Sequence, residues 1–169
     1  MSQLFLLRHA KAEWAKPGMR DFDRPLKERG RRNAESIGSV MRQSGYLPDR
    51  VICSKATRAL ETWESLSTKL GAMECEVEIT EALYGSDASG YLQAINEAFD
   101  SNRLLLIGHN PMMEDVAFAL AGSGDEASLS NLEKGFPTAG LAVIEFATPL
   151  SEAAPGKGTL QAFLTPSDM

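Results

Sequence analysis

The chain has 169 residues, of which 43% are hydrophobic and 24% charged, and this predicts one globular domain over residues 1–169. Its apolar runs are too short for a signal peptide or a membrane span, and two cysteines are too few for a disulfide framework, so we expect a cytoplasmic protein. The net charge of −6 argues against a general nucleic-acid binder. Residues 1–58 nevertheless hold 13 Lys/Arg against 6 Asp/Glu, so the cations are concentrated in the N-terminal part.

Three short apolar runs predict strands that are buried on both faces of a sheet. They are residues 4–7, 51–53 and 103–107. A helical pattern follows each run: residues 26–43, residues 60–70, and a third helix with Asn110 as N-cap and Pro111 at its first position. Strands that alternate with helices indicate parallel pairing.

The rest of the chain adds elements of both kinds. Apolar residues alternate with glutamates over residues 75–79, which predicts a strand nearer the sheet edge. Residues 91–99 predict a further amphipathic helix, residues 141–146 and 159–164 the final strands, and residues 122–135 a long surface loop. The expected fold is therefore α/β, a three-layer α/β/α sandwich with a mainly parallel sheet.

The sequence contains two histidines, and both come directly after predicted buried strands. His9 follows the first strand beside Arg8, and His109 follows the third strand just before the helix at Pro111. Ligand sites in open α/β sheets form outside the carboxyl ends of the strands, so we expect both histidines in one crevice. Either histidine alone is more often structural, but the pair favours catalysis.

Arginines near this crevice indicate a phosphoryl ligand, because a guanidinium binds phosphate oxygens in a bidentate manner. Arg8 adjoins His9, and Arg58 follows the second strand. Free amides of the helix near Pro111 would add anion binding. The sequence has no phosphate-binding P-loop and no acidic cluster with metal spacing. These residues suggest phosphoryl transfer to His9 and then hydrolysis, without a metal or cofactor.

Four segments occur in the order seen in one family: Arg8-His9-Ala10, Ser54 to Arg58 followed by Ala59 and Thr62, Gly108-His109-Asn110-Pro111, and Pro137-Thr138-Ala139-Gly140. The chain thereby resembles the histidine phosphatase superfamily from about residue 4 to residue 146. Its short length and the segment Asp23-Arg24-Pro25-Leu26 are most similar to the SixA-type phosphohistidine phosphatases. The resemblance implies a phosphoglycerate-mutase-like fold. Only 50 residues separate Arg58 from His109, so we expect no large lid insertion between them and an open site.

The same resemblance implies roles for four residues. His9 would be the phosphorylated nucleophile, Arg8 and Arg58 phosphate ligands, and His109 the second histidine of the phosphate pocket. Ala10 departs from the family, which has glycine at this position. Alanine would strain the nucleophile loop if the backbone there has positive φ, and would be harmless at negative φ.

Two assignments stay open. Arg24 would be a further phosphate ligand by similarity, and a salt bridge with Asp21 or Asp23 is an equal alternative. The proton donor would be Glu81, which falls where larger members of the superfamily place a glutamate acid; Asp87 in the next loop or no residue at all are the alternatives.

An open site suits a phosphorylated side chain that another protein presents, because small metabolites are usually enclosed. We therefore expect a phosphohistidine-bearing protein as substrate and partner, and no nucleic acid or membrane. A small phosphomonoester, such as a sugar phosphate or a phosphorylated cofactor, is the enzymatic alternative. A third hypothesis is a protein that binds phosphate but has lost turnover. The sequence does not predict the oligomeric state.

Overall fold

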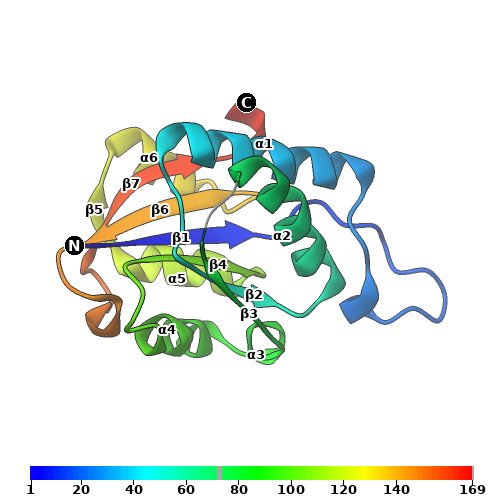
Figure 1. Cartoon of the computed structure of the whole chain (residues 1–169), viewed down its shortest axis with the longest axis horizontal. Helices are drawn as coiled ribbons and strands as arrows, with labels where there is room; N and C mark the ends of the chain where they lie inside the picture. The colour runs from blue at the N-terminus through cyan, green and yellow to red at the C-terminus, as the bar shows by residue number, and fades with distance from the viewer. Residues whose placement is uncertain (72–73, 169) are drawn as a thin grey trace.

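A seven-stranded sheet lies at the centre of the computed structural model, which describes residues 1–71 and 74–168 (Figure 1). Its strands are β1 (Ser2–Arg8), β2 (Arg50–Ser54), β3 (Glu76–Thr80), β4 (Arg103–Gly108), β5 (Ala121–Gly124), β6 (Leu141–Phe146) and β7 (Gly158–Leu164). They lie in the order β3-β2-β4-β1-β6-β7-β5. The pairs β2–β3, β2–β4, β1–β4 and β5–β7 are parallel, whereas β1–β6 and β6–β7 are antiparallel. The mainly parallel sheet that the sequence predicts is confirmed.

Helices cover both faces of the sheet and complete three layers (Figure 1). They are α1 (Glu28–Ser44), α2 (Thr57–Leu70), α3 (Ala82–Gly85), α4 (Ala88–Glu97), α5 (Met112–Leu120) and α6 (Glu126–Glu133), with short 3-10 turns at Asp21–Asp23, Leu150–Glu152 and Pro166–Asp168. Helices α1 and α2 pack on one face, and α4 and α5 on the other. No helix of the described residues is long and apolar enough to cross a membrane.

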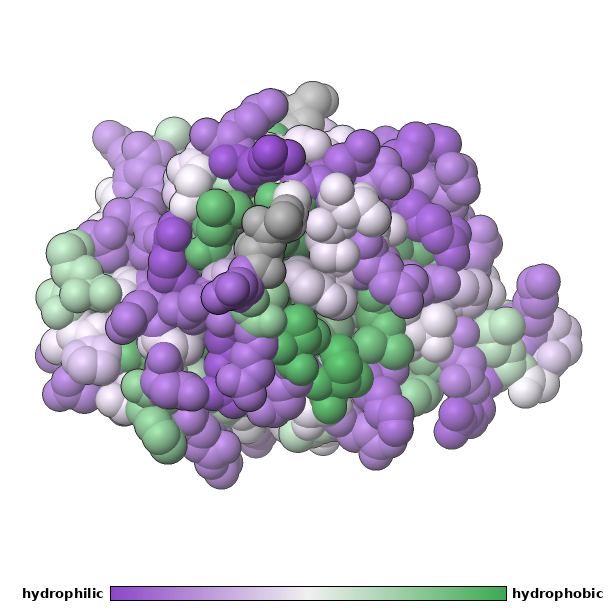
Figure 2. Space-filling model, in the orientation of Figure 1, coloured by the Kyte–Doolittle hydropathy of each residue, from purple (hydrophilic) through white to green (hydrophobic). Residues whose placement is uncertain are grey.

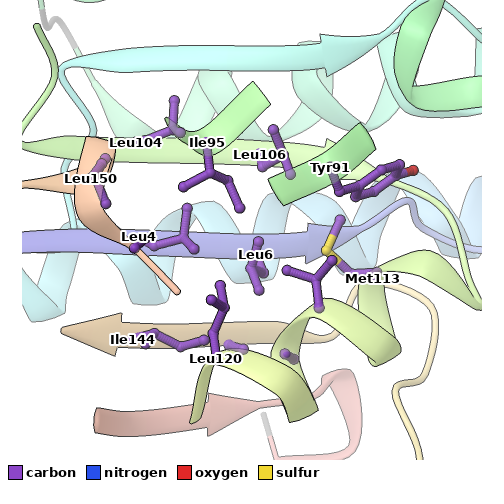
Figure 3. Close-up of a cluster of buried hydrophobic side chains, with 14 of the residues drawn as sticks. Leu4, Leu6, Tyr91, Ile95, Leu104, Leu106, Met113, Leu120, Ile144 and Leu150 are labelled. Carbon is purple, nitrogen blue, oxygen red and sulfur yellow. The ribbon is translucent and has the colours of Figure 1, made fainter. Parts of the chain in front are cut away.

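The strand period of two residues divides the core into two clusters. In β1, Leu4 and Leu6 point to the α4–α5 face, while Phe5 and Leu7 point to the α1–α2 face. All four side chains are fully buried. Figure 3 shows the first cluster, in which Tyr91 of α4 lies at the end nearest the carboxyl end of β1. The central strand is therefore held between both helical layers, and its end is fixed in place.

Three details of the expected fold are wrong. Residues 122–135 are not a loop, because β5 pairs with β7 and α6 begins after Asp125, whose carboxylate accepts a hydrogen bond from the amide of Ser128. Helix α4 ends at Glu97, so Phe99 lies beyond it and is 74% exposed. Helix α5 begins at Met112, one residue after the proline that was expected as its first position.

The face that Figure 2 shows is largely hydrophilic, and hydrophobic side chains gather in the lower middle, over the region where Figure 1 places β3. Val77 and Ile79 of β3 are 40% and 42% exposed. Since β3 is an edge strand with β2 as its partner, the prediction of an edge position is confirmed.

We predict that Gly38→Ala lowers the free energy of unfolding. A methyl group at Gly38 would lie 2.5 Å from the carbonyl oxygen of Leu66, where α1 crosses α2. Overpacking of this kind costs about 1–3 kcal/mol, more than the ~1 kcal/mol that replacing a mid-helix glycine gains. Urea denaturation measures the change, and Ser36→Ala on the exposed side of α1 is the control. If the free energy of unfolding of Gly38→Ala equals or exceeds that of the wild type, α1 and α2 do not pack closely at this residue.

Candidate active site

The two histidines lie side by side because their strands are parallel neighbours. Arg8 of β1 and Gly108 of β4 are partners in register, and the next residue of each strand is a histidine. The His9 amide donates to the carbonyl of Gly108 at 3.0 Å, and the two imidazole centroids are 5.3 Å apart. Both side chains are buried. The structure thus brings together the residues that the sequence predicts for one crevice.

His9 is held in the form a nucleophile needs. Its Nδ1 lies 2.8 Å from the carbonyl oxygen of Ala10, which can only accept, so Nδ1 carries the proton and Nε2 keeps its lone pair. Burial, together with the charges of His109, Arg58 and Arg8, lowers the pKa of His9 to about 3. His9 therefore remains a neutral imidazole at physiological pH.

Arg58 lies against this lone pair. It occupies the first turn of α2, and its Nε donates to His9 Nε2 at 3.4 Å. Thr62, one turn further on, accepts from the Ala10 amide at 2.9 Å and donates to the Arg58 carbonyl at 2.7 Å. This hydroxyl joins the nucleophile loop to the arginine, and its bond to Ala10 spans 52 residues, so the sequence pattern around Arg58 does not show it.

Two buried nitrogen atoms at the site, Arg8 Nε and His109 Nδ1, have no hydrogen-bond partner among the described residues. Arg8 is oriented by a 2.9 Å bond from Nη1 to the Phe136 carbonyl. The Nε2 of His109 lies 2.8 Å from Ser54 Oγ, and burial lowers the pKa of His109 to about 4. Buried polar groups are usually satisfied, so these two atoms are suited to bind an anion.

The turn before β6 supports the nucleophile loop. The amide of Ala139 lies 3.1 Å from the carbonyls of both Arg8 and His9. Ala139 has φ of 58°, and in the described chain it is the one non-glycine residue with positive φ. Ala10 consequently lies at negative φ, so alanine in place of the family's glycine causes no strain there.

Arg24 reaches the site through Asp21. Its Nε donates to Asp21 Oδ1 at 2.9 Å, so the expected salt bridge is present, and its charge still lowers the pKa of His109. Asp21 Oδ2 also accepts from Arg58 Nη2 at 3.0 Å and from the Tyr84 hydroxyl at 2.8 Å. Sequence analysis considered the pair of Asp21 with Arg24, but not the contacts of Asp21 with Arg58 and Tyr84, which join segments 37 and 63 residues apart.

The proposed acids are placed differently. Glu81 precedes α3 with its side chain 72% exposed, and its carboxylate lies 3.6 Å from Lys55 Nζ. Asp87 caps α4, because its carboxylate accepts from the Gly90 amide at 3.0 Å. A structural cap explains Asp87 without a catalytic role.

Three amides at the start of α5 are not free, although we expected free amides there. The amide of Met113 donates to the His109 carbonyl, that of Glu114 to Asn110 Oδ1, and that of Asp115 to the Pro111 carbonyl. These three donors are already satisfied within the chain.

Comparison with known proteins agrees with this geometry. The model of the histidine phosphatase superfamily (branch 1) matches residues 4–102. An uncharacterized protein of Mycobacterium tuberculosis is 34% identical over 163 residues, 95% of this chain and 99% of that protein. The crystal structure of an Agrobacterium tumefaciens protein, provisionally named phosphohistidine phosphatase SixA, has a TM-score of 0.84 at 33% identity and covers 98% of each chain. A protein of Nakamurella multipartitia with the same provisional name has a TM-score of 0.79 at 27% identity, over 98% of this chain and 96% of that one.

The chain therefore belongs to the histidine phosphatase superfamily. Within it, the structure is similar to the SixA-type proteins over nearly its whole length.

We predict that the free energy of unfolding falls as the pH drops below about 6.5. In the folded chain the pKa values of His9 and His109 are about 3 and 4, whereas in the unfolded chain both are near 6.5. The unfolded chain therefore binds more protons in this interval, and acid favours it. Urea denaturation from pH 7.5 to 5.5 measures the slope, which should be shallower in the double variant His9→Gln/His109→Gln. Equal slopes in both proteins would show that the histidines are not neutral when folded.

Proposed function

We propose that the protein is a phosphatase that hydrolyses protein phosphohistidine through a covalent phosphohistidine intermediate on His9. The observation that carries this proposal is the unprotonated Nε2 of His9 beside Arg58 Nε, in a pocket where Arg8 Nε and His109 Nδ1 are unsatisfied. A neutral imidazole flanked by fixed positive charge suits attack on a phosphoryl group. Similarity to proteins named SixA supports the substrate class.

The reaction would proceed in two steps. The Nε2 of His9 attacks phosphorus, and the electron pair of the breaking bond stays on the leaving group. The phosphoryl oxygens bind to Arg8, Arg58 and His109. Arg24, which pairs with Asp21, adds positive charge that acts on His109. Water then attacks phosphorus, the bond to Nε2 breaks, and phosphate leaves with His9 neutral again. Each role is filled by a side chain of the chain itself, so we expect no metal requirement.

The leaving group decides which substrate fits. An imidazole has a pKa near 6.5 and can depart without help, whereas an alkoxide must be protonated as it leaves. Glu81 is exposed and pairs with Lys55, and Asp87 caps a helix, so neither is a buried acid poised to donate. A weak or absent general acid supports phosphohistidine as the substrate.

The surroundings of the site support a protein-borne substrate. Between Arg58 and His109 the described residues form α2, β3, α3, α4 and β4, which belong to the sandwich, so they build no lid. An open site can accept a side chain presented by a partner protein. A small phosphomonoester is the second candidate, and the observation that favours it is the carboxylate of Glu81, close to Asp21 and Tyr84 at the mouth of the site.

We predict that the purified protein hydrolyses a phosphohistidine peptide faster than a panel of small phosphomonoesters, and that EDTA leaves the rate unchanged. His9→Ala should abolish turnover, because it removes the attacking nitrogen. The intermediate is measured as labelled phosphate bound to the protein, after rapid quenching without acid. This label should be acid-labile and absent from His9→Ala. As much bound label on His9→Ala as on the wild type, or activity that needs an added divalent ion, would contradict this mechanism.

We predict that Glu81→Gln slows hydrolysis of an alkyl phosphate far more than that of a phosphohistidine peptide, since only the alkoxide needs a proton. Arg58→Ala is the comparison, and it should cost roughly 2 kcal/mol or more in kcat/KM on both substrates. The two substrates are compared in both variants. An equal and large loss on both substrates in Glu81→Gln would make Glu81 a general acid for either.

A further inference from the structure

A hollow of about 460 Å³ lies against the phosphate site and has no role in the steps above. Two of its lining residues contact Arg58: Asp21 through a 3.0 Å ion pair, and Tyr84, whose ring centroid is 5.7 Å from the guanidinium carbon. Tyr84 also packs edge-on against His109 at 5.5 Å. The hollow is lined by Arg20, Asp21, Phe22, Glu81, Tyr84 and Gly85.

The carboxylate of Asp21 is fixed in position but still accessible. Arg58, Arg24 and the Tyr84 hydroxyl donate to it at 2.8–3.0 Å, and Arg58 Nη1 also donates to its backbone carbonyl at 2.8 Å. Partial burial raises the pKa of Asp21, but the hydrogen bond from Tyr84 and the arginines outweigh it and lower the pKa below its usual value. Its side chain is 56% exposed. A carboxylate has about four acceptor sites, so it can bind one more donor.

The guanidinium of Arg58 connects the nucleophile to the hollow. Its Nε donates to His9 Nε2 and its Nη2 donates to Asp21 Oδ2, so Asp21 and His9 are neighbours along one guanidinium. Attacking and leaving atoms are in line across phosphorus, so the leaving group departs on the side away from His9. The hollow that Asp21 and Tyr84 line is the recess next to the site that can receive it.

The lining of the hollow suits a flat ring that carries an N–H group. The rings of Phe22 and Tyr84 meet edge to face at 4.9 Å, and each has a guanidinium over it, that of Arg20 at 5.5 Å and that of Arg58 at 5.7 Å. Asp21 and Glu81 supply carboxylates, and the guanidinium of Arg20 is held by Asp23 at 2.8 and 3.1 Å. A carboxylate accepts a strong hydrogen bond from such an N–H group.

We propose that this hollow receives the imidazole ring of the phosphohistidine, and that Asp21 accepts a hydrogen bond from the ring nitrogen that does not carry phosphorus. This inference rests on the proposed function and names the residue that selects the substrate. The His9 Nε2–P bond forms as the substrate N–P bond breaks, and the electron pair of the broken bond stays on the substrate nitrogen. The other ring nitrogen keeps its proton, so neutral imidazole departs and no proton donor is required.

Asp21→Asn tests the assignment with two substrates, a phosphohistidine peptide and p-nitrophenyl phosphate. Nitrophenolate leaves as an anion, needs no proton and makes no use of a carboxylate. We expect kcat/KM for the peptide to fall about tenfold or more, because a charge-assisted hydrogen bond to the ring is lost. The rate on p-nitrophenyl phosphate should fall far less, since the asparagine oxygen can still accept from Arg58 and nitrophenolate makes no use of the lost carboxylate.

Asp23→Asn is the matched control, because Asp23 lies in the same 3-10 turn but pairs with exposed Arg20. It should leave both rates unchanged. Equal losses on both substrates in Asp21→Asn would show that Asp21 only positions Arg58, and no change on either would remove it from the site; both results overturn the inference. A wild-type protein that cleaves p-nitrophenyl phosphate but not the peptide overturns the proposed substrate itself.

Discussion

The parallel pairing of β1 with β4 is the constraint on which the site depends. Because Arg8 and Gly108 are partners in register, the residues after them leave the sheet at the same edge, and both are histidines. A shift of one residue would turn every side chain of β1 to the other face and separate the two core clusters from their helices. The same burial that fixes this register therefore fixes the distance between the imidazoles.

Burial at that edge also sets the charges. Two histidines kept neutral by desolvation lie among three arginines, with Asp21 as the carboxylate that contacts Arg58 and Arg24 directly. Bringing cations together is unfavourable, and a phosphoryl group supplies the negative charge that would relieve it. Positive charge with unsatisfied donors indicates a pocket built around an anion.

Much of this arrangement could be predicted from the sequence, because it depends on local patterns. Buried strands are recognised in the sequence as apolar runs, and the residues that follow each run lie at the carboxyl edge of the sheet. This rule predicts that His9, Arg58 and His109 lie close together. The contacts of Asp21 with Tyr84, of Thr62 with Ala10 and of Tyr91 with His109 could not be found this way. They depend on how loops fold back over the sheet, and no spacing along the chain encodes them.

Tyr91 shows how such a contact couples the core to the site. Its ring is fully buried in the α4–α5 cluster, while its hydroxyl accepts from the His109 amide at 3.0 Å and donates to the Leu83 carbonyl at 2.7 Å. A methyl group at Gly108 would lie 2.5 Å from that hydroxyl, so glycine is required for the close approach. Through Leu83 the same hydroxyl holds α3, which carries Tyr84 and hence a wall of the hollow. One buried side chain thus contacts both the backbone of His109 and the segment that carries a wall of the hollow, so packing in the core fixes the distance between them.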